Sequence, residues 1–263
     1  MNLTQLANPR ILDQPVYTPG KPIEKVAEQF GFAHHEIVKL ASNENPWGPS
    51  RAALQAINAA IHEANLYTFF LQDEMAGLIS ELEGIGSEHI SVGAGSGEIL
   101  KMGGLLASMQ EGSIVVPDPT FEDLPRYAGN NGCEVIRVPV NGQMAIDLEA
   151  MASAIRSDTK LVYICNPNNP IPTIVEKNAL RDFVLEVSRD RMVFVDEAYH
   201  EFVDNPDYSS MMDLVREGHR NIIIARTASK IHGLAGLRVG FGFSHPDLAA
   251  EINRRMTGTL NIV

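Results

Sequence analysis

Residues that can do chemistry follow directly after short apolar segments of this sequence. One apolar segment leads into Gly93-Ala94-Gly95-Ser96-Gly97-Glu98, the next into Pro117-Asp118-Pro119-Thr120-Phe121, and a third into Asn166-Pro167-Asn168-Asn169-Pro170. Two further segments end in Asp196-Glu197-Ala198-Tyr199 and in Arg226-Thr227-Ala228-Ser229-Lys230. Because ligands of open α/β sheets gather at the carboxyl ends of the strands, we expect these five runs to meet at one edge of a sheet.

The glycine-rich run predicts a site for an anion. Free N–H groups at a helix that begins near Gly97, together with the helix dipole, attract a negative group. The run is equally typical of a tight turn that needs glycine. Thr227, Ser229 and Arg238 favour the anion, because hydroxyls and a guanidinium are donors suited to a phosphate monoester.

Lys230 and Asp196 are the candidate charged groups of a reaction. An amine that forms imines must be partly desolvated so that it is not held as an ammonium, and Lys230 lies among small residues after two hydroxyl residues. Asp196 ends the apolar segment 192–195, so we expect it to be buried and to need a partner. A protonated pyridine nitrogen is one such partner, and capping of the next segment is the alternative interpretation. Tyr199 can aim its hydroxyl at the same ligand.

The elements that must position these residues alternate along the chain. The predicted strands are residues 90–92, 113–116, 134–138, 161–165, 192–195, 222–225 and 239–243. The predicted helices begin near Gly97, Glu122, Asp147, Glu176 and Ser209, with others at 23–30, from a Ser50 cap through Ile61, at 73–82 and from Asp247. Apolar strands separated by helices indicate a sheet covered on both faces. The prediction is an α/β fold with a mostly parallel, doubly wound sheet and helices on both faces.

The length of 263 residues predicts one large domain plus part of a second. Residues 1–48, rich in Pro, Asn and Gly, are predicted to form an N-terminal arm and part of a small domain, and residues 49–263 the large domain. The chain stops at Val263 just after a predicted helix, so we expect a C-terminal small domain to be absent.

Composition excludes several classes of partner. A net charge of -12 without a basic run disfavours nucleic acid. No apolar stretch is long enough to cross a bilayer, and the N-terminus does not resemble a signal peptide. The two cysteines and eight histidines show no metal-ligand spacing, so no metal is expected. A cytoplasmic location is the resulting expectation.

Taken together, the motifs resemble fold-type I pyridoxal-phosphate (PLP) aminotransferases, and within them the histidinol-phosphate aminotransferase subgroup. The strongest segment is Ser229-Lys230 followed by Gly233-Leu234-Ala235-Gly236-Leu237-Arg238-Val239-Gly240. The runs that start at Asn166 and Asp196 stand in the order typical of the family. Tyr17-Thr18-Pro19-Gly20-Lys21-Pro22 and Ser42-Asn43-Glu44-Asn45-Pro46-Trp47-Gly48-Pro49-Ser50 resemble the subgroup's N-terminal signatures, so the resemblance covers nearly the whole chain.

The resemblance implies pyridoxal 5'-phosphate as the cofactor and a role for each residue. Lys230 would bond to the cofactor aldehyde and later move the reacting proton, Asp196 would pair with the pyridinium nitrogen, and Tyr199 would tune the imine. The other implied cofactor contacts are Asn169 and Tyr199 at the ring 3-oxygen, Phe121 on the ring face, and Ser96, Gly97, Thr227, Ser229 and Arg238 at the phosphate.

The implied reaction is ping-pong transamination between an amino donor and a 2-oxo acid, with a place in histidine biosynthesis. Histidinol phosphate or an aromatic amino acid would be the donor, and Tyr17 and Asn43 would contact the substrate. Tyr67 would reach the cofactor phosphate of a neighbouring subunit, which implies a homodimer.

Departures from the family pattern and three alternatives stay open. Ile171-Pro172 replaces Thr-Gly, and Thr68-Phe69-Phe70 follows Tyr67 in place of Pro-Asp. A dinucleotide-binding oxidoreductase would use Gly93, Gly95 and Gly97 with Asp118, although the glycine spacing is wrong and prolines flank the aspartate. A PLP-dependent decarboxylase of a phosphorylated amino acid would share the same cofactor contacts. The third alternative is a truncated PLP-binding chain with little activity.

Overall fold

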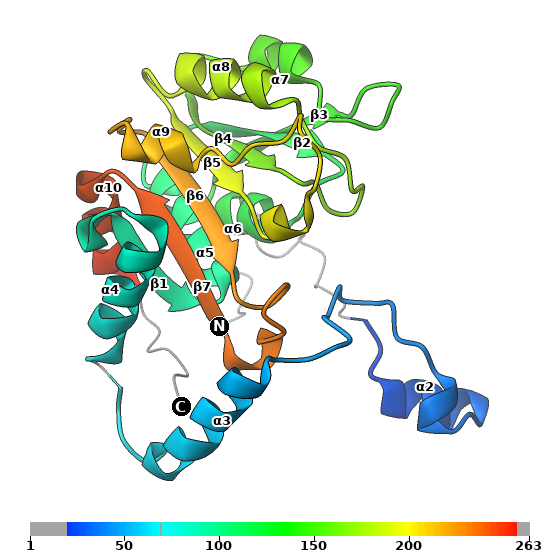
Figure 1. Cartoon of the computed structure of the whole chain (residues 1–263). Coiled ribbons are helices and arrows are strands. Elements are labelled where there is room, and N and C mark those ends of the chain that lie inside the picture. Colours follow the sequence, from blue (N-terminus) through cyan, green and yellow to red (C-terminus); the bar gives the residue numbers. More distant parts are fainter. Residues whose placement is uncertain (1–19, 69, 257–263) are drawn as a thin grey trace, which may run out of the picture.

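A computed structural model describes residues 20–68 and 70–256. Within these residues, seven strands form one sheet in the order β1-β7-β6-β5-β4-β2-β3 (Figure 1). The strands are β1 Ile90–Ala94, β2 Ser113–Asp118, β3 Glu134–Pro139, β4 Thr159–Cys165, β5 Met192–Asp196, β6 Ile222–Thr227 and β7 Val239–Ser244. Strands β2 to β6 pair in parallel, whereas β7 runs antiparallel to both β1 and β6. The predicted mostly parallel sheet is confirmed, and the direction of β7 is the feature that the sequence pattern did not reveal.

The helices begin close to the predicted positions. They are α2 Ile23–Phe30, α3 Arg51–Ala60, α4 Leu71–Glu83, α5 Ser96–Ser108, α6 Asp123–Asn130, α7 Leu148–Ala154, α8 Lys177–Val187, α9 Met212–Arg216 and α10 Pro246–Arg255. Single 3₁₀ turns occur at His34–Glu36, Ile61–Glu63, Ser87–His89, His200–Phe202 and Ala235–Leu237. Ser50 caps α3 as predicted, since its Oγ accepts a 3.1 Å bond from the Ala53 N–H. Helix α9 begins three residues later than expected, because the Ser210 hydroxyl and the Met211 N–H both donate to Glu197.

Two apolar layers cover the two faces of the sheet. Alternate residues of one strand point to opposite faces, so Ile114 belongs to the apolar layer that includes α5, α6 and α10, whereas Val115 belongs to the layer that includes α4, α7, α8 and α9. In Figure 1, α7 and α8 lie over one face and α5 and α6 behind the other. No helix of the described ranges is both long and apolar enough to cross a membrane.

The segment before α3 packs against the loop after β6, while α2 lies apart from the α/β body (Figure 1). Asn45 Nδ2 donates a 2.9 Å hydrogen bond to the carbonyl of Ile231, in the loop after β6. A Cβ atom on Gly233 would lie 2.4 Å from the carbonyl oxygen of Gly48, so the two backbones touch. The predicted division between residues 48 and 49 stays a prediction.

The turn between β1 and α5 lies directly against β7, and this contact leaves room for no side chain at position 240. A Cβ atom on Gly240 would stand 2.1 Å from the Ser96 nitrogen and 2.2 Å from the Gly95 carbonyl carbon. Both are backbone atoms, so neither can swing aside.

We expect Gly240→Ala to lower the free energy of unfolding by about 1–3 kcal/mol, because the added methyl group overpacks this contact. Gly236→Ala is the matched control, since a Cβ atom there meets nothing within 4 Å. Urea unfolding of both variants measures the difference. An unchanged midpoint for Gly240→Ala would contradict the close approach of the two backbones.

Candidate functional site

A cavity of about 630 Å³ lies where the carboxyl ends of β4, β5 and β6 meet the arm, a volume typical of small-molecule sites. It brings together eleven of the predicted site residues: Asn43, Ser96, Gly97, Phe121, Asn169, Asp196, Tyr199, Thr227, Ser229, Lys230 and Arg238. Tyr67 is 78% exposed and does not line this cavity. Tyr17 lies outside the described residues. The strand-end runs therefore converge as expected, while the role of each residue stays a prediction.

Asp196 is a carboxylate held in the interior of the protein. It is 2% exposed, and its Oδ1 accepts a 3.1 Å bond from the Ala198 N–H. Its Oδ2 accepts a 3.2 Å bond from the hydroxyl of Tyr163. Burial raises the pKa of Asp196 to about 6, and the nearby carboxylates of Asp123 and Glu197 act in the same direction. A cationic ligand in the cavity would relieve this cost.

Lys230 presents a partly buried amine to the same cavity. Its Nζ donates to the carbonyl oxygens of Ser42 and Asn43, each at 3.2 Å, and lies 5.5 Å from the centre of the Tyr199 ring. Burial lowers the pKa of Lys230, against the opposing pull of Glu44 and Asp196. The desolvated lysine expected for imine chemistry is therefore present.

Tyr199 joins the arm to the loop after β4. Its hydroxyl oxygen accepts a 3.0 Å bond from Asn43 Nδ2 and a 3.4 Å bond from Asn169 Nδ2. Burial raises the pKa of Tyr199, so the phenol keeps its proton at neutral pH. Asn43 thus contacts both Tyr199 and Lys230, and it places the arm over the cavity.

Donors suited to an anion gather beside the beginning of α5. Thr227 Oγ1 donates to Ser229 Oγ at 3.0 Å, and both hydroxyls line the cavity. Arg238 donates to the carbonyls of Ala94 at 3.2 Å and Ala235 at 2.9 Å, which holds its guanidinium against the glycine-rich turn. Gly95 has a φ of 77°, and a Cβ there would lie 2.3 Å from the Arg238 Nη2. Gly95 therefore permits both the positive φ of the turn and the close approach of the Arg238 guanidinium.

Two buried polar contacts of the site were missed from the sequence. One is the Tyr163 hydroxyl on Asp196, which a tyrosine inside an apolar strand could have signalled because a buried phenol needs a partner. The other joins two strand-end loops. Thr120 Oγ1 donates to Asn168 Oδ1 at 3.0 Å, and Asn168 Nδ2 donates to the Pro119 carbonyl at 3.0 Å.

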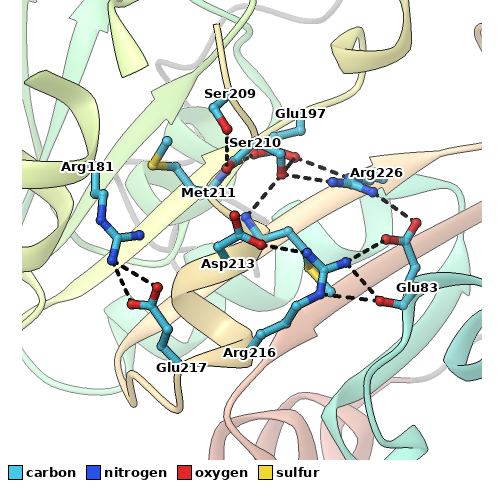
Figure 2. Close-up of polar contacts among 11 residues, drawn as sticks. Glu83, Arg181, Glu197, Ser209, Ser210, Met211, Asp213, Arg216, Glu217 and Arg226 are labelled. Atoms are coloured by element: carbon cyan, nitrogen blue, oxygen red, sulfur yellow. Dashed lines mark hydrogen bonds and ion pairs between the residues drawn. The ribbon is translucent and has the colours of Figure 1, made fainter. Parts of the chain in front are cut away.

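A buried ionic network lies behind the cavity, on the opposite face of β5 and β6 (Figure 2). Arg226 donates from Nε to Glu197 at 3.1 Å, from Nη1 to Glu83 at 2.9 Å and from Nη2 to the Ser210 hydroxyl at 2.8 Å. Ser210 in turn donates to Glu197 at 2.7 Å. Glu197 and Arg226 directly adjoin Asp196 and Thr227, so this network fixes the two strand ends that carry cavity residues.

No group of three or more His, Cys, Asp or Glu side chains in residues 20–68 and 70–256 could hold a metal ion. The chemistry of the cavity instead combines a buried carboxylate, a desolvated amine and anion donors.

A model of the aminotransferase class I and II family matches residues 35–260. The chain belongs to this family. Histidinol-phosphate aminotransferases are among its relatives. That of Moorella thermoacetica is 42% identical over 248 residues, which cover 93% of this chain and 62% of the relative. That of Brevibacillus brevis is 38% identical over 258 residues, covering 97% and 70%. The chain therefore spans 62% to 70% of the length of these two relatives.

Solved structures agree on the fold. The crystal structure of histidinol-phosphate aminotransferase from Sinorhizobium meliloti in complex with pyridoxal-5'-phosphate has a TM-score of 0.80 and 25% sequence identity to this chain. The match covers 95% of this chain and 66% of the other. The sheet is that of the fold-type I PLP-dependent transferases, as predicted.

The family implies PLP, and the residues of this chain fit that group. Asp196 offers a buried anion to a pyridinium nitrogen, and Lys230 offers an amine to an aldehyde. Thr227, Ser229 and Arg238 offer donors to a phosphate in the same cavity.

The raised pKa of Asp196 predicts a stability that depends on pH. The folded protein holds this proton more tightly than the unfolded chain, so stability without cofactor falls as pH rises from about 4 to about 6. An asparagine side chain at this position cannot ionise. The stability of Asp196→Asn relative to the original chain should therefore increase by about 2 kcal/mol between pH 4.5 and 7.5.

Denaturant unfolding of the cofactor-free proteins at the two pH values measures this difference. Asp182→Asn, which changes an exposed carboxylate on α8, is the control. If the free energies of unfolding of the original chain and of Asp196→Asn change equally with pH, the prediction that burial raises the pKa of Asp196 is wrong.

The network of Figure 2 predicts a large loss of stability when Arg226 is removed. Arg226→Met leaves Glu197, which is 1% exposed, without its cation, and should cost about 3–5 kcal/mol. Arg181→Met is the control because the Arg181–Glu217 pair lies at the surface, where screening makes its loss nearly neutral. Urea unfolding compares the two variants. An equal loss of unfolding free energy in the two variants would contradict the prediction that the buried Arg226–Glu197 pair matters more than the surface pair.

Proposed function

We propose that this chain binds PLP in the cavity and catalyses transamination. The observation that carries the proposal is one cavity in which a buried carboxylate, Asp196, and a partly buried amine, Lys230, meet the anion donors beside α5. Bound PLP would supply an aldehyde for amine exchange and a ring that draws electrons from the bonds to a substrate α-carbon.

In this proposal, each residue performs a defined task. Lys230 Nζ would hold the cofactor at its aldehyde carbon and would move the proton at the substrate α-carbon, which its lowered pKa assists. The Asp196 carboxylate would accept a hydrogen bond from the protonated ring nitrogen. Tyr199 and Asn169 bind the ring 3-oxygen, and Phe121 packs on the ring face. Ser96, Gly97, Thr227, Ser229 and Arg238 bind the phosphate.

The proposed substrates are an amino donor and a 2-oxo acid. Relatives named histidinol-phosphate aminotransferase support histidinol phosphate as the donor and a role in histidine biosynthesis, with aromatic amino acids as the next candidates. A second cavity of about 630 Å³ shares Asn43, Asn169, Pro170 and Tyr199 with the first, which leaves space for a substrate side chain beside the cofactor. Tyr17 and Asn43 are the proposed substrate contacts.

A dimer is also proposed. Large apolar side chains around α3 and α4 are exposed, including Leu66, Phe70 and Leu82, and a second copy of the chain would cover them. Tyr67 lies among them, as a residue that reaches a neighbouring subunit must. A cytoplasmic location stays a prediction.

The oxidoreductase alternative is weaker on physical grounds, whereas the decarboxylase alternative needs a chemical test. Asp118, the ribose contact of an oxidoreductase, instead lies 3.6 Å from Arg137 and outside the cavity. A decarboxylase would use the same cofactor residues, because bond choice depends on groups that orient the substrate carboxylate. Product analysis with phosphorylated amino acids separates decarboxylation from transamination.

Lys230 provides the test of the proposed function. We expect PLP followed by borohydride reduction to label Lys230, as mapped by mass spectrometry of peptides. Lys230→Ala should abolish the label and reduce turnover of histidinol phosphate with a 2-oxo acid by at least about 100-fold. Lys101→Ala, which changes an exposed lysine on α5, is the control for label and turnover. A label on another lysine, or full turnover in Lys230→Ala, would refute the assignment.

A further inference from the structure

Tyr163 carries a hydroxyl within the apolar second part of β4, residues 161–165. It lies in β4 opposite Phe194 of β5, is fully buried, and packs with its ring centre 6.0 Å from that of Phe194. Its side chain belongs to the same face of the sheet as Asp196, two residues beyond Phe194. The hydroxyl therefore reaches diagonally across the strand pair to Asp196 Oδ2, at 3.2 Å.

The direction of this hydrogen bond is fixed by the chemistry of the two groups. Burial raises the pKa of Tyr163 well above its usual range, so the phenol keeps its proton and acts as the donor. The Asp196 carboxylate accepts, with Oδ1 bonded to the Ala198 N–H and Oδ2 to Tyr163. Both bonds favour the ionised carboxylate, whereas burial favours the neutral acid.

We propose that Tyr163 is a positioning residue for the ring nitrogen of the cofactor: its hydroxyl holds Asp196 as an oriented anion, so that the shared proton rests on the nitrogen. This inference rests on the proposed function, in which Asp196 meets the pyridine nitrogen of PLP. Without the hydroxyl, Oδ2 loses a donor and the carboxylate becomes more basic. The proton would then move from the nitrogen toward Asp196, and a neutral ring would draw electrons less strongly.

Several titratable groups on neighbouring elements lie near Asp196. Asp123 of α6 and Glu197, directly after β5, disfavour its ionisation, and Lys230 in the loop after β6 favours it. Cys165 of β4 and Tyr199 after β5 are neutral at physiological pH because burial raises their pKa values. Tyr163→Phe leaves these groups in place and removes one hydroxyl.

The first test uses the protein without cofactor. Carbon-13 NMR follows the titration of the Asp196 carboxyl, which is assigned by its loss in Asp196→Asn. Tyr163→Phe should move the midpoint upward by about 0.5 to 1 pH unit, the equivalent of one lost hydrogen bond. Tyr208→Phe is the control, since that partly buried phenol donates at 3.4 Å to the Asn166 carbonyl instead. An unchanged midpoint in Tyr163→Phe would overturn the inference.

The second test uses the loaded protein. With PLP labelled by nitrogen-15 in the ring, the chemical shift of the nitrogen reports its proton, and Tyr163→Phe should lower the protonated fraction at neutral pH. The Kd for PLP should rise several-fold, whereas the Kd for an analogue with carbon in place of the ring nitrogen should stay unchanged. A stable variant that weakens both ligands equally would indicate a merely structural role and overturn the inference.

The two failures can be told apart. An original chain whose bound ring nitrogen carries no proton would overturn the proposed function of Asp196. A protonated nitrogen that Tyr163→Phe leaves unchanged would overturn the Tyr163 inference alone.

Discussion

The burial of the Asp196 carboxylate is the constraint on which the site depends. An anion at the end of an apolar strand is costly, and hydrogen bonds from Tyr163 and Ala198 offset only part of that cost. A cation placed across the cavity from Lys230 would offset more of it. The free-energy cost of burying the Asp196 carboxylate therefore favours the binding of a cationic ligand. The other residues of the cavity determine which ligand shape fits.

Alternation along β5 and β6 separates two kinds of charge. Asp196 and Thr227 face the cavity, while their neighbours Glu197 and Arg226 pair on the opposite face with Glu83 and Ser210. The pairing behind the sheet is buried and therefore only weakly screened by salt. It supports the two strand ends from the opposite face, in addition to the hydrogen bonds that Asp196 and Thr227 form on the cavity side.

Much of this arrangement could be predicted from the sequence because it follows from local patterns. Apolar runs fixed the strands, capping residues such as Ser50 fixed helix starts, and strand-end polar runs identified Lys230, Asp196 and their neighbours. The antiparallel direction of β7 could not be predicted, since its apolar run looks the same in either direction. The contacts of the arm with Lys230 join residues 187 and 188 positions apart, and no periodicity signals such a pair. Tyr67 was assigned by resemblance, and a single chain does not test a role in a neighbouring subunit.

The glycines of β7 also determine how that strand is aligned. Gly240 and Gly242 face α5, where a Cβ atom would lie 2.1 Å from the Ser96 nitrogen and 2.9 Å from the Ile99 side chain. A slip of one residue would turn Val239 and Phe241 toward this surface, and neither side chain fits. A one-residue slip of β7 against its neighbours is therefore sterically excluded. Arg238 immediately precedes β7. The alignment that Gly240 and Gly242 impose on this strand therefore also determines where the Arg238 guanidinium enters the site.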